Sequence, residues 1–257
     1  MKNIHFPKFL DYIPPIIAFV AAVVAIVGAP KWNEKALGIF KITPLGWAVL
    51  GIGLLALIAS LLVTARNSRE QRQQRHARER IAAIGKKGLL EAILHSVHPL
   101  TSSSLWNGKM EAPRSPADFM DPARREVLAG VELTGNSPYS DGSAKDYPWH
   151  EIIQGAAKEG RKRVFRSLQI YSSYLPAEVM DVVTRYTNSE FLWMRLAGLT
   201  TVVNANVRFA PSRPVRFFMV KDDHMHNPGY EEFWTLLDQA IQLCGGRTVD
   251  GRAMFDR

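Results

Sequence analysis

The chain has 257 residues and a formal net charge of +8, because 32 Lys and Arg face 24 Asp and Glu. Its single cysteine, Cys244, excludes an internal disulfide framework and suits a reducing compartment. The excess of positive charge favours an acidic partner, either anionic lipid or nucleic acid.

The first apolar segment covers residues 12–30, between the charged residues Asp11 and Lys31. Its uncharged interior of about twenty residues meets the length that a membrane-spanning helix needs. A cleaved signal peptide is the alternative, because a basic leader, an apolar core and a small-residue Val-Gly-Ala end are all present. Pro30 directly after Ala29 argues against cleavage there. We therefore expect a retained transmembrane helix.

The second apolar segment covers residues 42–65 and contains no charged residue. Six arginines follow it at once, and Lys and Arg mark the cytoplasmic flank of a membrane span. They are Arg66, Arg69, Arg72, Arg75, Arg78 and Arg80. The link of residues 31–41 is short, so the two segments predict a transmembrane helical hairpin over residues 1–65, with both termini in the cytoplasm.

Small residues recur along both predicted spans at spacings that allow helix backbones to approach closely. They are Ala18, Ala22 and Ala25 in the first span and Gly53, Ala56 and Ser60 in the second. Neither span carries an ionisable residue at depth, which disfavours a transporter and means that any membrane permeabilisation requires a homo-oligomer.

Residues 66–99 predict a basic juxtamembrane segment followed by an amphipathic helix that is interrupted at Gly85 and Gly88 and ends before Pro99. Residues 100–148 are rich in Ser, Gly and Pro, and we expect an irregular linker with one helix over residues 116–131.

Residues 149–257 predict a cytoplasmic helical domain, so the fold class is all-α. We expect helices over residues 149–158 and 164–175, one beginning at Pro176, one capped by Ser189 that carries Leu192 to Val203, and one over residues 230–244. Residues 204–214 break the helical pattern, and residues 215–220 form the one strand candidate.

Groups that can bind metal occur at two places. Glu91, His95 and His98 share one side of a predicted helix, and Asp222, Asp223, His224 and His226 form the densest cluster. Neither spacing matches a known ligand motif, and the serines at 102–104 lack the glycine frame of a nucleophile elbow. We expect no catalytic residue, cofactor or metal.

A second basic patch contains Arg161, Lys162 and Arg163. Together with the six arginines after residue 65, it is a candidate contact for anionic lipid or nucleic acid, with membrane topology and a solvated helix end as the simpler explanations.

Two predicted spans followed by one cytoplasmic domain resemble the two-transmembrane effector proteins of bacterial anti-phage systems, including those associated with retrons and with cyclic-nucleotide signalling. The resemblance covers the first quarter of the chain and is one of architecture. It implies an inner-membrane protein that disrupts the membrane when a cytoplasmic sensor releases or clusters its hairpins. For retron-associated members, it implies a reverse transcriptase and its RNA–DNA product as partners.

The leading hypothesis is therefore a non-enzymatic inner-membrane effector whose helical domain receives a signal and controls oligomerisation of the hairpins. One alternative is a membrane-anchored scaffold that recruits a cytoplasmic protein or nucleoprotein. Another is a membrane-tethered hydrolase or metal enzyme that uses the His224 region.

Overall fold

The computed structural model describes residues 44–106, 108–137, 147–217, 220 and 229–255, together with isolated positions 16, 19–20, 35 and 38. The chain divides into two compact units, Met1–Ala77 and Arg78–Arg257. The described part is mostly helical and contains two short strands, as expected for the all-α class. Ala18, Ala22 and Ala25 lie outside the described residues, as does the rest of the predicted first span at residues 12–30 apart from positions 16, 19 and 20, so the predicted hairpin is not shown.

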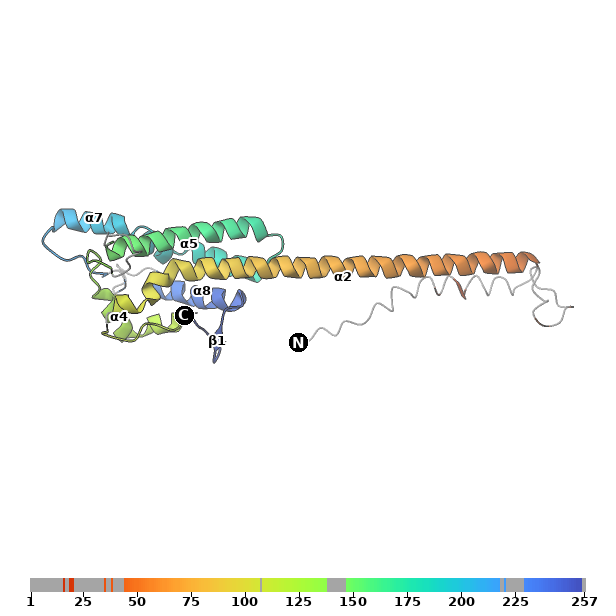
Figure 1. Ribbon diagram of the computed structural model, residues 1–257, viewed down its shortest axis with the longest axis horizontal. Coiled ribbons are helices and arrows are strands. Elements are labelled where there is room, and N and C mark those ends of the chain that lie inside the picture. The colour runs from red at the N-terminus through yellow and green to blue at the C-terminus, as the bar shows by residue number, and fades with distance from the viewer. Residues whose placement is uncertain are drawn as a thin grey trace. The chain divides into compact units, whose positions relative to one another are not determined.

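Helix α2 covers Pro44–Thr101 in 58 residues (Figure 1). It therefore contains residues 44–65 of the second apolar segment, the arginines and the predicted amphipathic helix. The predicted interruption at Gly85 and Gly88 is wrong, as is the predicted end before Pro99, which lies inside the last turn. Gly85 is needed for close packing, because a Cβ there would lie 2.9 Å from the Cβ of Tyr171.

Residues 100–137 contribute to the core instead of forming only an irregular linker. They contain α3 (Ser103–Trp106), the 3-10 helix η3 (Pro116–Met120) and α4 (Pro122–Ala129). The predicted helix over residues 116–131 is thus two shorter ones. Trp106 and Phe119 are 1% and 0% exposed, so this segment supplies large aromatic side chains to the interior.

Helix α5 covers Trp149–Tyr171 without a break, where the sequence predicts two helices. The predicted gap between those two helices contains Gly160, where a Cβ would lie 2.5 Å from the Cβ of Ser96. Gly85 meets Tyr171 while Gly160 meets Ser96, so α5 runs antiparallel to the second half of α2. A glycine is therefore placed here for contact between helices and does not end one.

Helix α6 covers Ala177–Asn188 after Pro176, which confirms the predicted start. Ser189 does not cap the next helix, because its hydroxyl donates to the carbonyl of Tyr186. The chain continues as the π-helix η4 (Phe191–Leu196) and then α7 (Leu199–Phe209), so the predicted single helix is divided and the predicted break at residues 204–214 comes too early.

Helix α8 covers Tyr230–Leu243, as predicted, and buries one whole face. Gly245 follows with φ of +83°, the left-handed conformation that commonly ends a helix. The two strands, β1 (Thr248–Val249) and β2 (Arg252–Ala253), form an antiparallel hairpin that the sequence analysis did not predict.

Among the described residues of the predicted strand, 215–217 and 220, the structure has one bridge, between Glu132 and Arg216. Around it the Leu133 amide donates to the Val215 carbonyl at 2.8 Å, and the Phe217 amide donates to the Val131 carbonyl at 3.0 Å. Val215 and Phe217 are buried. Residues 215–217 therefore form a short buried edge that is hydrogen-bonded to residues 131–133.

Aromatic rings from distant parts of the chain meet on α8. Phe119 stacks on Trp234 with centroids 3.7 Å apart and planes 3° apart, and Tyr186 stacks on Phe233 at 5.3 Å. The Tyr186 hydroxyl lies 2.6 Å from the Ser96 hydroxyl, which itself donates to the Ile93 carbonyl. Burial raises the pKa of Tyr186, so this phenol stays protonated and donates to Ser96.

Candidate membrane segment and basic surfaces

One helix among the described residues is long and apolar enough to cross a membrane, and it is the stretch of α2 that starts at Gly46. Its most apolar window has a mean hydropathy of 2.5 and none of that window is buried. Large apolar side chains along it are exposed, including Trp47, Ile52, Leu54, Leu55, Ile58, Leu62 and Val63. Full burial of an exposed Leu, Ile or Val side chain gains about 1.5–3 kcal/mol, so transfer of this partly exposed apolar surface out of water is favourable.

The small residues of the second predicted span lie on one face of α2. At about 100° per residue, Gly53, Ala56 and Ser60 fall within an arc of about 60°. Gly53 and Ser60 are half-buried and Ala56 is exposed. The helix thus presents a narrow face without bulky side chains, flanked by leucine and isoleucine.

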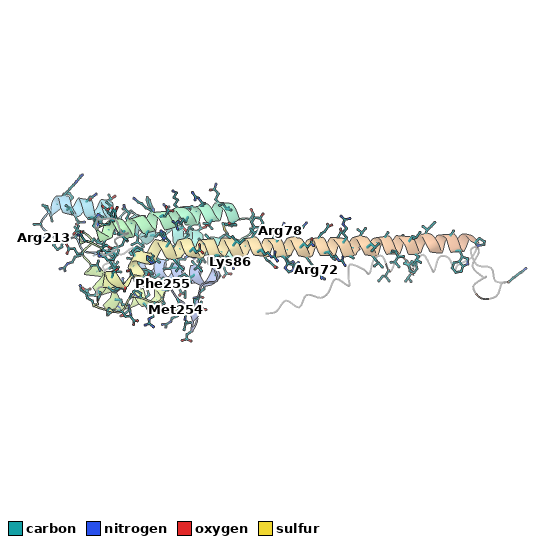
Figure 2. The ribbon with its side chains drawn as sticks, viewed as in Figure 1. Arg72, Arg78, Lys86, Arg213, Met254 and Phe255 are labelled. Atoms are coloured by element: carbon teal, nitrogen blue, oxygen red, sulfur yellow. The ribbon has the colours of Figure 1, made fainter. Side chains whose placement is uncertain are left out.

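The six arginines after residue 65 are all exposed on α2 (Figure 2 labels Arg72 and Arg78). Arg66 forms an ion pair with Glu70 at 3.0 Å, an exposed contact of little energetic weight. A spacing of three residues shifts the azimuth by about 60° each time, so the guanidinium groups wind around the helix. Such a distribution suits surroundings that enclose the helix, as lipid headgroups enclose a span, better than a partner on one side.

The three cations of the second basic patch have different surroundings in the structure. Arg163 pairs with Glu159 at 2.9 Å, and this contact lowers the pKa of the Glu159 carboxyl. Arg161 points elsewhere, since its guanidinium carbon lies 5.0 Å from the ring centre of Phe165 and 5.5 Å from that of Trp193. Lys162 is exposed.

The exposed rings beside Arg161 were not found from the sequence, although the arginine was. Phe165 is one turn along the same helix, but Trp193 lies about thirty residues away and belongs to η4. Only the fold brings them together. A search for exposed aromatic residues near each basic run would have proposed Phe165 but had no means to propose Trp193.

The fold does not bring together those candidate metal ligands that belong to the described part of the chain. No group of three or more His, Cys, Asp or Glu among the described residues is arranged to hold a metal ion. Glu91 pairs with Lys87 at 3.9 Å. Burial, with Arg163 and His98 nearby, lowers the pKa of His95. Residues 221–228, with His224 and His226, lie outside the described part.

Cys244 lies at the end of α8 and is 5% exposed, as expected for a packed thiol. Burial raises its pKa to about 11 from an ordinary value of 9.0. At pH 8 the thiolate fraction is then about 100-fold lower than in an unfolded chain. We expect iodoacetamide to label the folded protein at least that much more slowly than the protein in denaturant, measured by intact mass. Equal rates would contradict the buried position.

This chain matches no family model, no curated protein and no solved structure. The structure by itself indicates three candidate sites. They are the exposed apolar part of α2, the arginines that follow it, and the surface around Arg161.

Proposed function

We propose that this protein is a non-enzymatic effector of the bacterial inner membrane, anchored by the apolar part of α2 with the chain from Arg66 onwards in the cytoplasm. The observation that carries this is the exposed apolar surface between Trp47 and Val63, on a helix with no charged residue before Arg66. A bilayer removes that surface from water, and the arginines then fall at the cytoplasmic headgroups.

The helical unit of residues 78–257 is the proposed receiver of a signal, and self-association of the spans is the proposed output. Gly53, Ala56 and Ser60 supply the face through which spans pack, because small residues let helix backbones approach and contact in lipid. An oligomer assembled in this way disrupts the membrane in defence against phage. A reverse transcriptase with its RNA–DNA product is one proposed partner, carried by resemblance in architecture.

The proposal is tested by inducing the protein in bacteria and following membrane potential with a voltage-sensitive dye. Ala56→Leu and Gly53→Leu are expected to slow depolarisation severalfold, because a bulky side chain separates the packed spans. Ala48→Leu is the matched control, since Ala48 is an exposed alanine about 80° around the helix from Ala56 and about 140° from Gly53. It is expected to leave depolarisation unchanged.

Membrane insertion of every variant is checked by carbonate extraction, and the orientation by the accessibility of a carboxyl-terminal tag. Wild-type protein that inserts correctly but leaves the potential unchanged would exclude the effector. It would favour the membrane-anchored scaffold, in which an unrelated hairpin replaces the spans without loss of function. A tag found outside the cell, or full-length protein that is soluble without detergent, would exclude both.

A further inference from the structure

We propose that an aromatic and basic surface on the helical unit binds single-stranded nucleic acid. The surface consists of Arg161, Phe165 and Trp193, with Lys158, Lys162 and Arg166 of α5. This inference goes beyond the proposed function, because it concerns residues of the second unit and does not require the membrane segment to disrupt anything.

Arg161 lies between two exposed rings. Its guanidinium carbon is 5.0 Å from the ring centre of Phe165 and 5.5 Å from that of Trp193. Its Nε donates to the carbonyl of Thr187 at 3.2 Å, which holds the side chain in place. Phe165 is 43% and Trp193 is 54% exposed, so both rings keep area available for another molecule.

The local fold exposes these rings. In η4, Phe191, Leu192 and Leu196 face the core and are 0% exposed, while Trp193 is turned outward. The Ala197 amide donates to the Leu192 carbonyl at 2.9 Å, the bond across five residues that defines a π-helix. Such wide turns are rare and occur frequently at functional sites.

Positive charge gathers on the side of α5 next to Phe165. At about 100° per residue, Lys158 lies within about 20° of Phe165, Lys162 within about 60° and Arg166 within about 100°. All three are exposed, and among the described residues no carboxylate pairs with them. Glu159 lies about 120° from Phe165 around the helix and pairs with Arg163 at 2.9 Å, and its charge interacts less strongly with Lys162. The rings therefore lie at the edge of a cationic face.

Alternating rings and cations fit a single strand best, because its bases stack on aromatic side chains while its phosphates contact Lys and Arg. A duplex pairs and stacks its bases internally, so it offers phosphates but no free base for Phe165 or Trp193. A second copy of this chain is disfavoured at the same surface, since pairing the two identical faces opposes like charges. The proposed ligand is therefore DNA or RNA in single-stranded form.

The test uses the full-length protein in detergent and fluorescence anisotropy of labelled oligothymidylate of about 20 nucleotides, long enough to span such a site. A duplex of equal length is the comparison. Trp193→Ala and Phe165→Ala are each expected to weaken single-strand binding about fivefold or more, the loss typical of one stacked base. Lys162→Glu is expected to weaken binding and reduce its dependence on salt.

Tyr174→Ala and Arg163→Gln are the matched controls and are expected to change binding less than twofold. Tyr174 is an aromatic residue of similar exposure, 41%, just beyond the end of α5, and Arg163 is the cation already paired with Glu159. Every variant keeps the arginines of α2, so non-specific binding there is constant. Circular dichroism confirms that each variant folds.

Absence of binding would overturn the proposal, as would binding that both ring variants leave unchanged. Equal affinity for duplex and single strand would also overturn it, because stacking would then contribute nothing. Displacement of the oligonucleotide by polyglutamate at equal charge concentration would indicate an acidic protein partner instead. None of these results depends on membrane potential, so failure here and failure of the effector proposal are separate.

Discussion

Replacing Trp234 by alanine is expected to reduce the free energy of unfolding of the helical unit by about 3–5 kcal/mol. Trp234 is 1% exposed and stacks on Phe119 at 3.7 Å, and it also meets Phe233 edge to face at 4.8 Å. Truncation removes both contacts and leaves a cavity at the point where η3 packs on α8. The midpoint of thermal unfolding, followed by circular dichroism in detergent, should fall by about 6–20 °C.

Two variants control for the loss of an indole. Trp193→Ala removes the same side chain from an exposed position and should lower the midpoint by no more than a few degrees. Trp234→Phe keeps a ring for stacking and removes an indole N–H that has no hydrogen-bond partner among the described residues. Its loss should be well below that of the alanine variant. Equal midpoints for all three would contradict the aromatic core.

Adding one methyl group at Gly160 is expected to destabilise the helical unit although alanine favours helices. The new Cβ would lie 2.5 Å from the Cβ and 2.7 Å from the Cα of Ser96, so α2 and α5 must separate. Overpacking of this kind costs about 1–3 kcal/mol, and separation also stretches the 2.6 Å hydrogen bond between Ser96 and Tyr186. Gly160→Ala should lower the thermal midpoint by about 2–12 °C.

Gly155→Ala is the control on the same helix. A Cβ at Gly155 meets none of the described atoms within 4 Å, so the substitution only restricts the unfolded chain and improves helix propensity. The expected change is a gain of about 0.5–1 kcal/mol. The two glycine variants should therefore shift the midpoint in opposite directions, and a gain at both positions would contradict the close approach of α2 and α5.

The sequence predicted the elements whose boundaries are encoded locally. Helices α6 and α8 begin and end near Pro176 and Gly245, where proline and glycine act through their own backbone geometry. It failed at Gly85 and Gly160 because a glycine inside a helix and a glycine at its end have the same local signature. Only the partner helix, with Tyr171 or Ser96 at that level, distinguishes the two.

The candidate sites divide in the same way. The apolar length of the second predicted span and the arginines after it are properties of consecutive residues, so both can be seen in the sequence directly. The surface around Arg161 depends on Trp193, whose outward position follows from the wide turn of η4 between residues 191 and 196. No periodicity in the sequence predicts a π-helix, so the sequence analysis assigned Trp193 to no surface.

The placement of the indole groups makes them usable as optical reporters. Trp106 and Trp234 are each 1% exposed, so their emission comes from a dry, apolar medium, whereas Trp193 is in contact with water. An ionic quencher such as iodide reaches the outer indole and is kept from the inner two. Trp47 is exposed as well, so the part of the iodide quenching that is lost in Trp193→Ala is the part that originates where a strand of nucleotides would lie. Protection of that part on adding ligand can be followed without any attached dye.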